Sequence, residues 1–274
     1  MQFKFGVVAL GLSVFTQGAL GSPASIPEVT GAPVAGKAAA DPSGGEPVIT
    51  SSGGTAFGGA LHPTPLVGTL VSQAIQPPPP LLTISIINQY GADVSTTHNR
   101  NADSPAATGA NFDPGVIRNG ATATFAAPTN WAGRVGIAAA RDGDLTDARD
   151  VSLIEANFIR DAGSGLAVAD VDVSYVDAFT VPITCSCSGR TVTGCNKNLL
   201  AISSCPAGYL HKNSCYNPLK ADNFATAATP FFAPCAHAGY TYPRDSLANS
   251  WGECQSGHIT CCIGTSCPPG PRQS

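Results

Sequence analysis

The chain has 274 residues, which is enough for one large domain or two small ones. Charged residues make up 12% of it, compared with about 25% in typical globular proteins, and its formal net charge is −4. A nucleic-acid-binding protein needs a basic stripe, and a protein that binds anionic membranes needs a basic patch. The composition therefore argues against both classes, and we expect no nucleic-acid partner.

The first 80 residues predict a secreted protein with an unstructured leader. Residues 1–21 have a basic start at Lys4, an apolar run and small residues before the cleavage site, which is the pattern of a signal peptide. No later segment reaches about 18 consecutive apolar residues, so we expect no transmembrane segment. Residues 22–80 are rich in Ala, Gly, Pro, Ser and Thr, which predicts a disordered linker or a cleaved pro-segment, with a glycosylated stalk as the alternative. We expect the mature protein to be extracellular or associated with a cell wall.

From residue 81 the pattern changes to short strands separated by Gly, Asn and Pro. Residues 82–87 alternate with a period of two and are rich in β-branched side chains. The segment 115–120 ends in Asn-Gly and precedes a strand at 121–125, which predicts a hairpin. Further strands are predicted at 134–138, 152–159 and 168–176. Together they predict a mainly β fold, an antiparallel β-sandwich over residues 81–267, followed by a tail at 268–274.

Residues 170–183 hold the most informative pattern in the chain. Asp170, Asp172 and Ser174 share one face of the predicted strand, and the alternating apolar residues share the other. Asp177 belongs to the opposite face unless the chain bends before it, and Ala178-Phe179 is a candidate for such a bend. Carboxylates aligned beside a disulfide framework in a secreted domain are typical of proteins that bind a hydroxyl-rich ligand such as a glycan.

All ten cysteines lie between residues 185 and 267. Their number is even and the compartment is oxidising, so we expect five disulfides. A zinc site is the alternative, because 185/187 and 261/262 are close pairs, but the histidine spacing of a zinc module is absent. We expect no metal and no cofactor. The same region predicts irregular loops with one or two short helices, for which residues 221–228 are the best candidate.

Four segments carry a resemblance to a known family: residues 133–136, 152–158, 172–183 and 240–245. They resemble, in order, the Ala-Arg-Val-Trp-Gly-Arg, Thr-Leu-Ala-Glu-Phe, Asp-Val-Ser-x-Val-Asp-Gly-Phe-Asn-Val-Pro-Met and Tyr-Ser-Tyr-Pro-x-Asp segments of thaumatin-like proteins (osmotin, pathogenesis-related 5). The resemblance covers roughly residues 81–267. It implies a β-sandwich with disulfide-rich loops packed beside it, and an acidic cleft between the two parts.

The resemblance also implies a function and a set of site residues. The family is known for one Arg, one Glu and three Asp around the cleft, which fall on Arg134, Glu155, Asp172, Asp177 and Asp245. It implies binding of β-1,3-glucan, weak endo-β-1,3-glucanase activity in some members, and antifungal action. The chain has fewer cysteines than the family, and Ala178 where the family has glycine, so it resembles a reduced-disulfide member.

The resemblance further implies the disulfide pairing. It pairs Cys195 with Cys235, Cys205 with Cys215, Cys254 with Cys185 or Cys187, and Cys267 with Cys261 or Cys262.

Hydrolysis of a glycosidic bond needs a carboxylic acid and a carboxylate that acts as base or nucleophile. Glu155 is our candidate acid, because its apolar neighbours can raise its pKa, and Asp172 is our candidate base or nucleophile. Arg134 would orient a carboxylate or bind sugar hydroxyls. The alternative is that Arg134 and the acids form a structural salt-bridge network.

Aromatic residues complete the predicted site. Tyr240 and Tyr242 are candidates for stacking on sugar rings or for packing, whereas Trp131 and Trp251 are predicted to pack. We predict a secreted monomer that binds β-1,3-glucan or a related cell-wall polysaccharide through an acidic cleft. The alternative is a non-enzymatic defence or effector protein that acts on a protein or a membrane.

Overall fold

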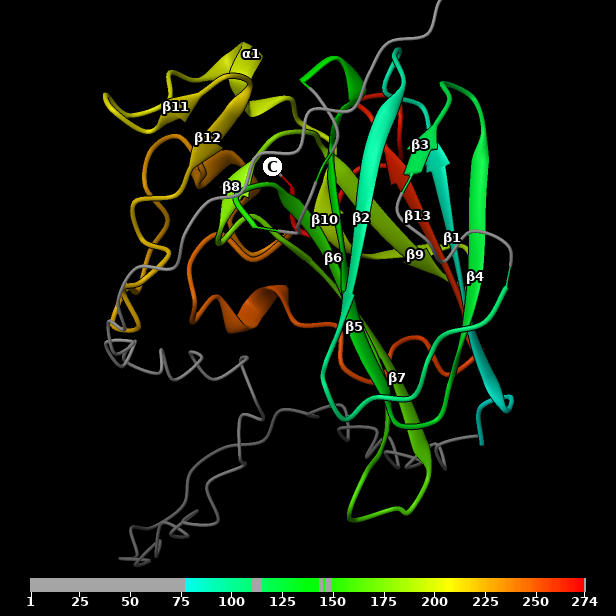
Figure 1. The fold of residues 1–274 in the computed structure, drawn as a ribbon. Helices are drawn as coiled ribbons and strands as arrows, with labels where there is room; N and C mark the ends of the chain where they lie inside the picture. The colour runs from blue at the N-terminus through cyan, green and yellow to red at the C-terminus, as the bar shows by residue number, and fades with distance from the viewer. Residues whose placement is uncertain (1–76, 110–114, 143–144, 146–148, 274) are drawn as a thin grey trace, which may run out of the picture. The chain divides into compact units, whose positions relative to one another are not determined.

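The computed structural model describes residues 77–109, 115–142, 145 and 149–273. The predicted signal peptide and the leader up to residue 76 lie outside these residues. The described chain is mainly β, with three sheets and a few short helical turns (Figure 1). Its first strand begins at Leu81, where the sequence pattern changes.

One five-stranded sheet, sheet A, joins the first strand to the last strand. Its order is β10 (Arg190–Cys195), β9 (Ile183–Cys187), β13 (His258–Ile263), β1 (Leu81–Asn88) and β4 (Thr122–Pro128). The strand β1 runs parallel to β13 and antiparallel to β4, so this sheet is mixed rather than purely antiparallel. The N-terminal and C-terminal strands of the fold are thus hydrogen-bonded to each other inside one sheet.

The second five-stranded sheet, sheet B, is antiparallel throughout. Its order is β3 (Gly115–Ile117), β2 (Val94–Arg100), β5 (Trp131–Ala139), β6 (Ser152–Arg160) and β7 (Ala167–Ser174). The three strands predicted from residue 134 onward are confirmed as β5, β6 and β7. At the turn between β6 and β7, Asp161 Oδ2 accepts hydrogen bonds from the N–H groups of Gly163 and Ser164.

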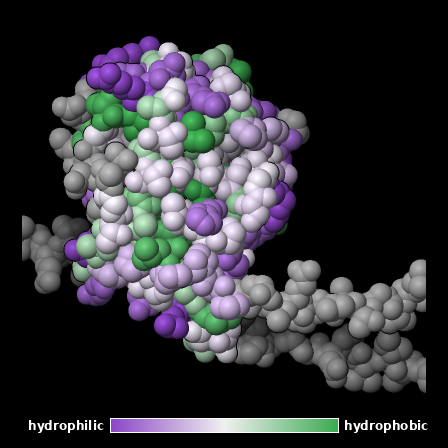
Figure 2. Space-filling model, turned by 90° about the vertical axis from the view of Figure 1, so that its right-hand side faces the viewer, coloured by the Kyte–Doolittle hydropathy of each residue, from purple (hydrophilic) through white to green (hydrophobic). Residues whose placement is uncertain are grey.

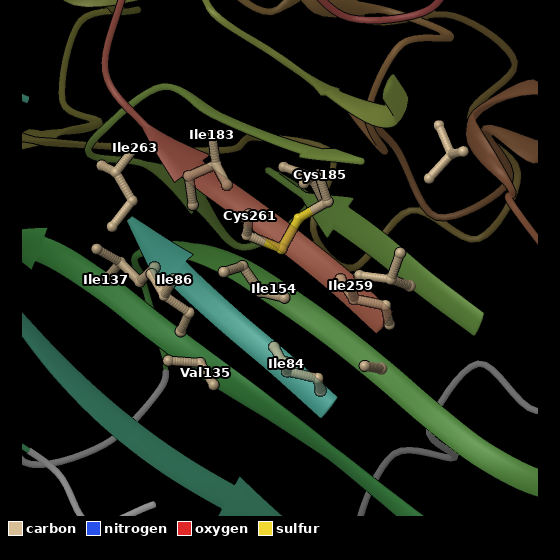
Figure 3. Close-up of a cluster of buried hydrophobic side chains, with 14 of the residues drawn as sticks. Ile84, Ile86, Val135, Ile137, Ile154, Ile183, Cys185, Ile259, Cys261 and Ile263 are labelled. Atoms are coloured by element: carbon tan, nitrogen blue, oxygen red, sulfur yellow. A yellow bond between two sulfur atoms is a disulfide. The ribbon is translucent and has the colours of Figure 1, made fainter. Parts of the chain in front are cut away.

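The apolar sides of the two large sheets face each other and form the main core (Figure 3). Ile84 and Ile86 of β1 and Ile154 of β6 point into it, and each is 1% exposed. The Cys185–Cys261 disulfide joins β9 to β13 within the same layer. Burial of branched apolar side chains stabilises the sandwich by about 25 cal/mol per Å² of surface removed from water.

The hairpin predicted at Asn119-Gly120 is wrong. The strand before this turn, β3, pairs with β2 in sheet B, and the strand after it, β4, pairs with β1 in sheet A. Asn119 Oδ1 accepts a hydrogen bond from Gly91 N, and Gly120, at a φ of 79°, donates its N–H to Asn88 O. The turn chemistry is local, but the partner of each strand depends on which sheet can bury its apolar face.

Residues 196–257 have little regular structure. They contain helix α1 (Leu199–Ile202), two 3-10 turns at Ala233–Cys235 and Ser246–Ala248, and the strands β11 (Leu210–His211) and β12 (Ser214–Tyr216), which form a small sheet with β8 (Ala178–Phe179). A further 3-10 turn at Ala140–Asp142 follows β5.

The helix predicted at 221–228 is absent, because that segment consists of turns. Asp222 Oδ1 accepts a hydrogen bond from Phe224 N, and Asp222 O accepts one from Ala225 N. A side chain that bonds the backbone two residues further on competes with a helix.

All ten cysteines form disulfides, and the pairing implied by the family resemblance is confirmed. The bonds are Cys185–Cys261, Cys187–Cys254, Cys195–Cys235, Cys205–Cys215 and Cys262–Cys267. With every thiol in a disulfide, the zinc alternative for the cysteines is excluded. Five such bonds are compatible with an extracellular protein.

Figure 2 shows one face of the molecule, on which hydrophobic residues are scattered among residues of intermediate hydropathy and smaller groups of hydrophilic residues. The many residues of intermediate hydropathy on this face agree with a chain in which only 12% of residues are charged. Within the described residues, no helix is long and apolar enough to span a membrane.

Candidate functional site: an acidic face on sheet B

The strand β7 buries side chains on both of its faces. Val171 and Val173 are each 0% exposed in the core between the sheets, whereas Asp170 and Ser174, on the other face, are 5% and 2% exposed. Asp172 lies between these two and is half-buried. The alternation predicted for this strand is confirmed, but its acidic face is largely covered rather than open to solvent.

Three of the predicted site residues form a row across sheet B. Arg134 of β5 lies opposite Glu155 of β6, and Glu155 lies opposite Asp172 of β7. Directly opposed residues on antiparallel strands have Cβ atoms about 4.5–5.5 Å apart, so these side chains are neighbours. All three are half-buried on the face away from the core. We call them the Arg–Glu–Asp row.

A second polar pair lies beside this row. Asn157 and Asp170 are cross-strand neighbours, and Asn157 Nδ2 donates to Asp170 Oδ2 at 3.0 Å. The Oδ1 atoms of both side chains are buried and have no hydrogen-bond partner among the described residues. An ionised carboxylate is stabilised by donors at both oxygens, so the lack of a donor at Oδ1 weakens the stabilisation of the ionised form of Asp170.

Burial raises the pKa of the carboxyl groups on this face. The pKa of Asp172 is raised to about 8, first by burial and then by the negative charge of Asp170. Burial also raises the pKa of Asp170, to about 6. Burial raises the pKa of Glu155 as well, and the Arg134 guanidinium opposes that increase. At neutral pH Asp172 therefore mostly keeps its proton, which does not fit its predicted role as a base or nucleophile.

A loop at residues 249–255, which we call the covering loop, crosses the free edge of β7. Its residue Ser250 is 1% exposed. Ser250 donates its N–H to Asp172 Oδ1 at 3.2 Å and its hydroxyl to Val171 O. The loop is thus attached both to the strand backbone and to one carboxyl group of the row.

The other end of the covering loop makes hydrogen bonds to the edge of β7 of the kind that a neighbouring strand would make. Gln255 Oε1 accepts a hydrogen bond from Ala169 N at 2.8 Å, and Gln255 Nε2 donates to Ala167 O at 3.1 Å. The Cys187–Cys254 disulfide connects the loop to β9. An edge strand whose backbone groups are satisfied in this way is protected from pairing with other chains.

Asp177 lies near the row because the chain bends after β7. The bend falls at residues 176–177, one step before the predicted position, since Ala178–Phe179 form β8. The negative charge of Asp177 contributes to the raised pKa of Glu155. Lys220 Nζ lies 3.3 Å from Asp177 Oδ1 and 2.8 Å from Asp150 Oδ1. Asp177 is therefore partly neutralised by a lysine that sequence reasoning did not select.

Asp245 is buried in the interior, at 0% exposure, rather than facing a ligand. Its Oδ2 accepts hydrogen bonds from Thr241 Oγ1 at 2.9 Å, Thr241 N at 3.3 Å and His237 N at 3.1 Å. Its Oδ1 lies 2.7 Å from His237 Nδ1. Because both oxygens are used by donors of the same chain, we revise its predicted binding role to that of holding residues 237–245 together.

The four aromatic candidates have different surroundings. Tyr240 is half-buried, and its pKa is raised by burial and then by the charge of Asp172, so its phenol lies near the row. Tyr242 makes a T-shaped contact with the ring of His237 and is only 5% exposed, so it offers no free ring face. Trp131 packs in the core as predicted, at 1% exposure. Trp251 is 44% exposed, so the prediction that it packs is wrong.

Sequence reasoning missed several residues of this face. Asn157 lies two positions after Glu155 on the same strand face, and this spacing is a signal that could have indicated it. Ser250 and Lys220 come from irregular loops, and no periodic pattern indicates where their side chains lie. Among the described residues, no group of three or more His, Cys, Asp or Glu side chains is placed to hold a metal ion.

Comparisons with known proteins add little to this picture. No protein-family model matches the chain, and no curated protein matches it. Among solved structures, the chain is similar to the protein elicitor MoHrip2 from Magnaporthe oryzae, with a TM-score of 0.29 and 14% sequence identity. This match covers 44% of the chain and 82% of the elicitor. A TM-score at this level carries no argument about function.

Proposed function

We propose that the chain is a thaumatin-like protein that binds a neutral, hydroxyl-rich polysaccharide, with β-1,3-glucan as the first candidate. The observation that supports this proposal is the alignment of Arg134, Glu155 and Asp172 as direct neighbours on one half-buried face. These are three of the five residues that the family resemblance implies for the acidic cleft. The guanidinium donates hydrogen bonds and the carboxyl groups accept them, which suits the hydroxyls of a sugar.

The raised pKa values favour a neutral ligand over a charged one. A protonated Asp172 offers a donor and an acceptor without a charge that must be desolvated when a ligand covers it. An anionic polysaccharide would meet the remaining carboxylates and a formal net charge of −4. Secretion and a monomeric state complete the proposal, and both stay predictions.

Binding is a better-supported activity than hydrolysis at neutral pH. Hydrolysis needs one protonated carboxyl group and one ionised carboxylate on either side of the glycosidic bond. The pKa of Glu155 and the pKa of Asp172 are both raised, and Asp172 is mostly protonated at pH 7. This pair therefore lacks the clear division between acid and base that a glycosidase requires.

Co-sedimentation with insoluble β-1,3-glucan tests the proposal. We expect wild-type protein to be retained, and Glu155→Gln to weaken retention about tenfold, because each lost hydrogen bond to a charged or acidic group costs about 1.5 kcal/mol. Glu253→Gln is the matched control, since Glu253 lies in the covering loop and pairs with Arg190 of β10. It should be retained like wild-type protein.

Two other outcomes are informative. Release of reducing ends that is lost in Glu155→Gln would show that the row hydrolyses glucan and would overturn binding without turnover. Neither retention nor release, together with leakage of lipid vesicles, would overturn the polysaccharide proposal. That result would favour the non-enzymatic defence protein.

A further inference from the structure

Residues 249–251 are attached to the edge of the Arg–Glu–Asp row by hydrogen bonds. Ser250, in the middle, is attached to Asp172 and to the β7 backbone as described above. Trp251 N donates to Asn249 Oδ1 at 2.7 Å, and the Asn249 side chain also hydrogen-bonds to the phenol of Tyr240. The segment that carries Trp251 is therefore positioned by four contacts, one of which goes to the row itself.

Trp251 stays 44% exposed even though its backbone N–H is hydrogen-bonded. Burial of a large aromatic ring stabilises a fold, so the exposed part of Trp251 adds nothing to the stability of this one and is open to a ligand. Rings of this kind are enriched where a binding surface combines an apolar plane with polar groups. Here the polar groups are the carboxyl of Asp172 and the phenol of Tyr240.

We propose that Trp251 stacks on a pyranose ring of the bound polysaccharide, with its hydroxyls directed to the Arg–Glu–Asp row. This inference rests on the proposed function and adds a ring-stacking residue to the same site. The ligand is a β-linked neutral polymer, whose rings have equatorial hydroxyls at the rim and flat C–H faces. The C–H face covers the indole, and the rim hydroxyls reach Asp172 and Glu155.

The two tryptophans of the chain allow a direct test by fluorescence. Trp131 is 1% exposed in the core, with its ring 6.0 Å from that of Phe125, so aqueous acrylamide should quench it poorly. Trp251 should supply the quenchable emission. We expect a linear β-1,3-glucan oligosaccharide to protect wild-type protein from acrylamide quenching. In Trp251→Phe, the remaining Trp131 emission should not respond to the oligosaccharide.

Affinity measurements separate this inference from the function on which it rests. Trp251→Ala should weaken glucan binding about tenfold, since an aromatic contact contributes about 0.5–1.5 kcal/mol beyond its buried area. Tyr209→Ala is the matched control, because Tyr209 is 39% exposed and precedes β11, outside the covering loop and the Arg–Glu–Asp row. Unchanged Trp131 emission in Trp251→Ala confirms that the variant is folded.

The outcomes are distinguishable. Wild-type binding that persists unweakened in Trp251→Ala, without protection from acrylamide, overturns the stacking role and leaves the proposed function intact. Absence of any binding by wild-type protein overturns both. Loss of binding in Trp251→Ala and in Glu155→Gln, but not in Tyr209→Ala, supports both.

Discussion

Strand β7 buries residues on both of its faces, but the chemistry of the two faces differs. On the inner face, Val171 and Val173 are 0% exposed against the apolar side of sheet A. On the outer face, Asp170 and Ser174 are 5% and 2% exposed under irregular chain, including the covering loop. Burial of the inner face stabilises the fold, whereas burial of the acids costs free energy unless they are protonated. The comparison shows that similar burial can hold a fold together on one face and prepare a site on the other.

The cost of the outer face is offset by local bonds and by a crosslink. The covering loop satisfies the β7 backbone at Val171, Ala169 and Ala167, and the Cys187–Cys254 disulfide spans 67 residues. A crosslink of this span restricts the unfolded chain and stabilises the folded one by about 2–4 kcal/mol. The disulfides therefore maintain a polar face that hydrophobic burial alone does not hold.

The largest expected effect on stability comes from a substitution on the inner face of sheet B. Phe158 of β6 is 0% exposed and lies opposite Trp131 and Ala169. Phe158→Ala leaves a cavity and should lower the free energy of unfolding by about 3–5 kcal/mol, measured by urea denaturation with the disulfides intact. Leu210→Ala, at a residue 54% exposed, is the control and should change stability by less than about 0.5 kcal/mol. A loss below about 1 kcal/mol for Phe158→Ala would contradict the proposed core.

A smaller effect is expected from a substitution on the outer face, and it should raise the free energy of unfolding instead of lowering it. The pKa of Asp172 is raised to about 8 in the folded protein, above its value of about 3.9 in an unfolded chain. Its contribution to stability is therefore fully present below about pH 4 and is lost as the pH rises towards 8. Asp172→Asn has no proton to lose, so its stability relative to wild-type protein should increase steadily as the pH rises from 4 to 8.

Urea denaturation of both proteins between pH 4 and pH 8 measures this difference. The exposed Asp103 offers a control, since Asp103→Asn should follow the wild-type profile. Parallel profiles for Asp172→Asn and wild-type protein would show that the Asp172 carboxyl is not buried as described.

The smallest effect concerns the edge of β7. Gln255→Ala removes the acceptor of Ala169 N and the donor to Ala167 O, and should cost about 1–2 kcal/mol. Amide hydrogen exchange locates the effect, because exchange at Ala169 should become faster. Val173 N, which donates to Thr193 Oγ1, is an internal control and should exchange as before. Equal acceleration at both amides would indicate general loosening instead of a capped edge.

The strands of the sandwich were predictable because their signal is local. Alternation of apolar residues indicated β1, β5, β6 and β7, and it placed Glu155 and Asp172 on strand faces. The Asn119-Gly120 turn was also recognised, but its two flanking strands joined different sheets. Pairing depends on contacts between residues far apart in sequence, and a turn motif does not encode them.

The candidate site likewise combines features that the sequence determined with features that only long-range contacts determined. The sequence alone determined which strand faces carry acids and that all ten cysteines lie in the C-terminal region. It also carried the family resemblance that suggested a glycan ligand. Only the tertiary structure decided that Arg134, Glu155 and Asp172 are direct neighbours, that Asp245 is buried by His237 and Thr241, and that Trp251 is exposed. Periodicity specifies the direction of a side chain relative to its own backbone. What covers that side chain depends on loops whose course is set by disulfides and by long-range packing.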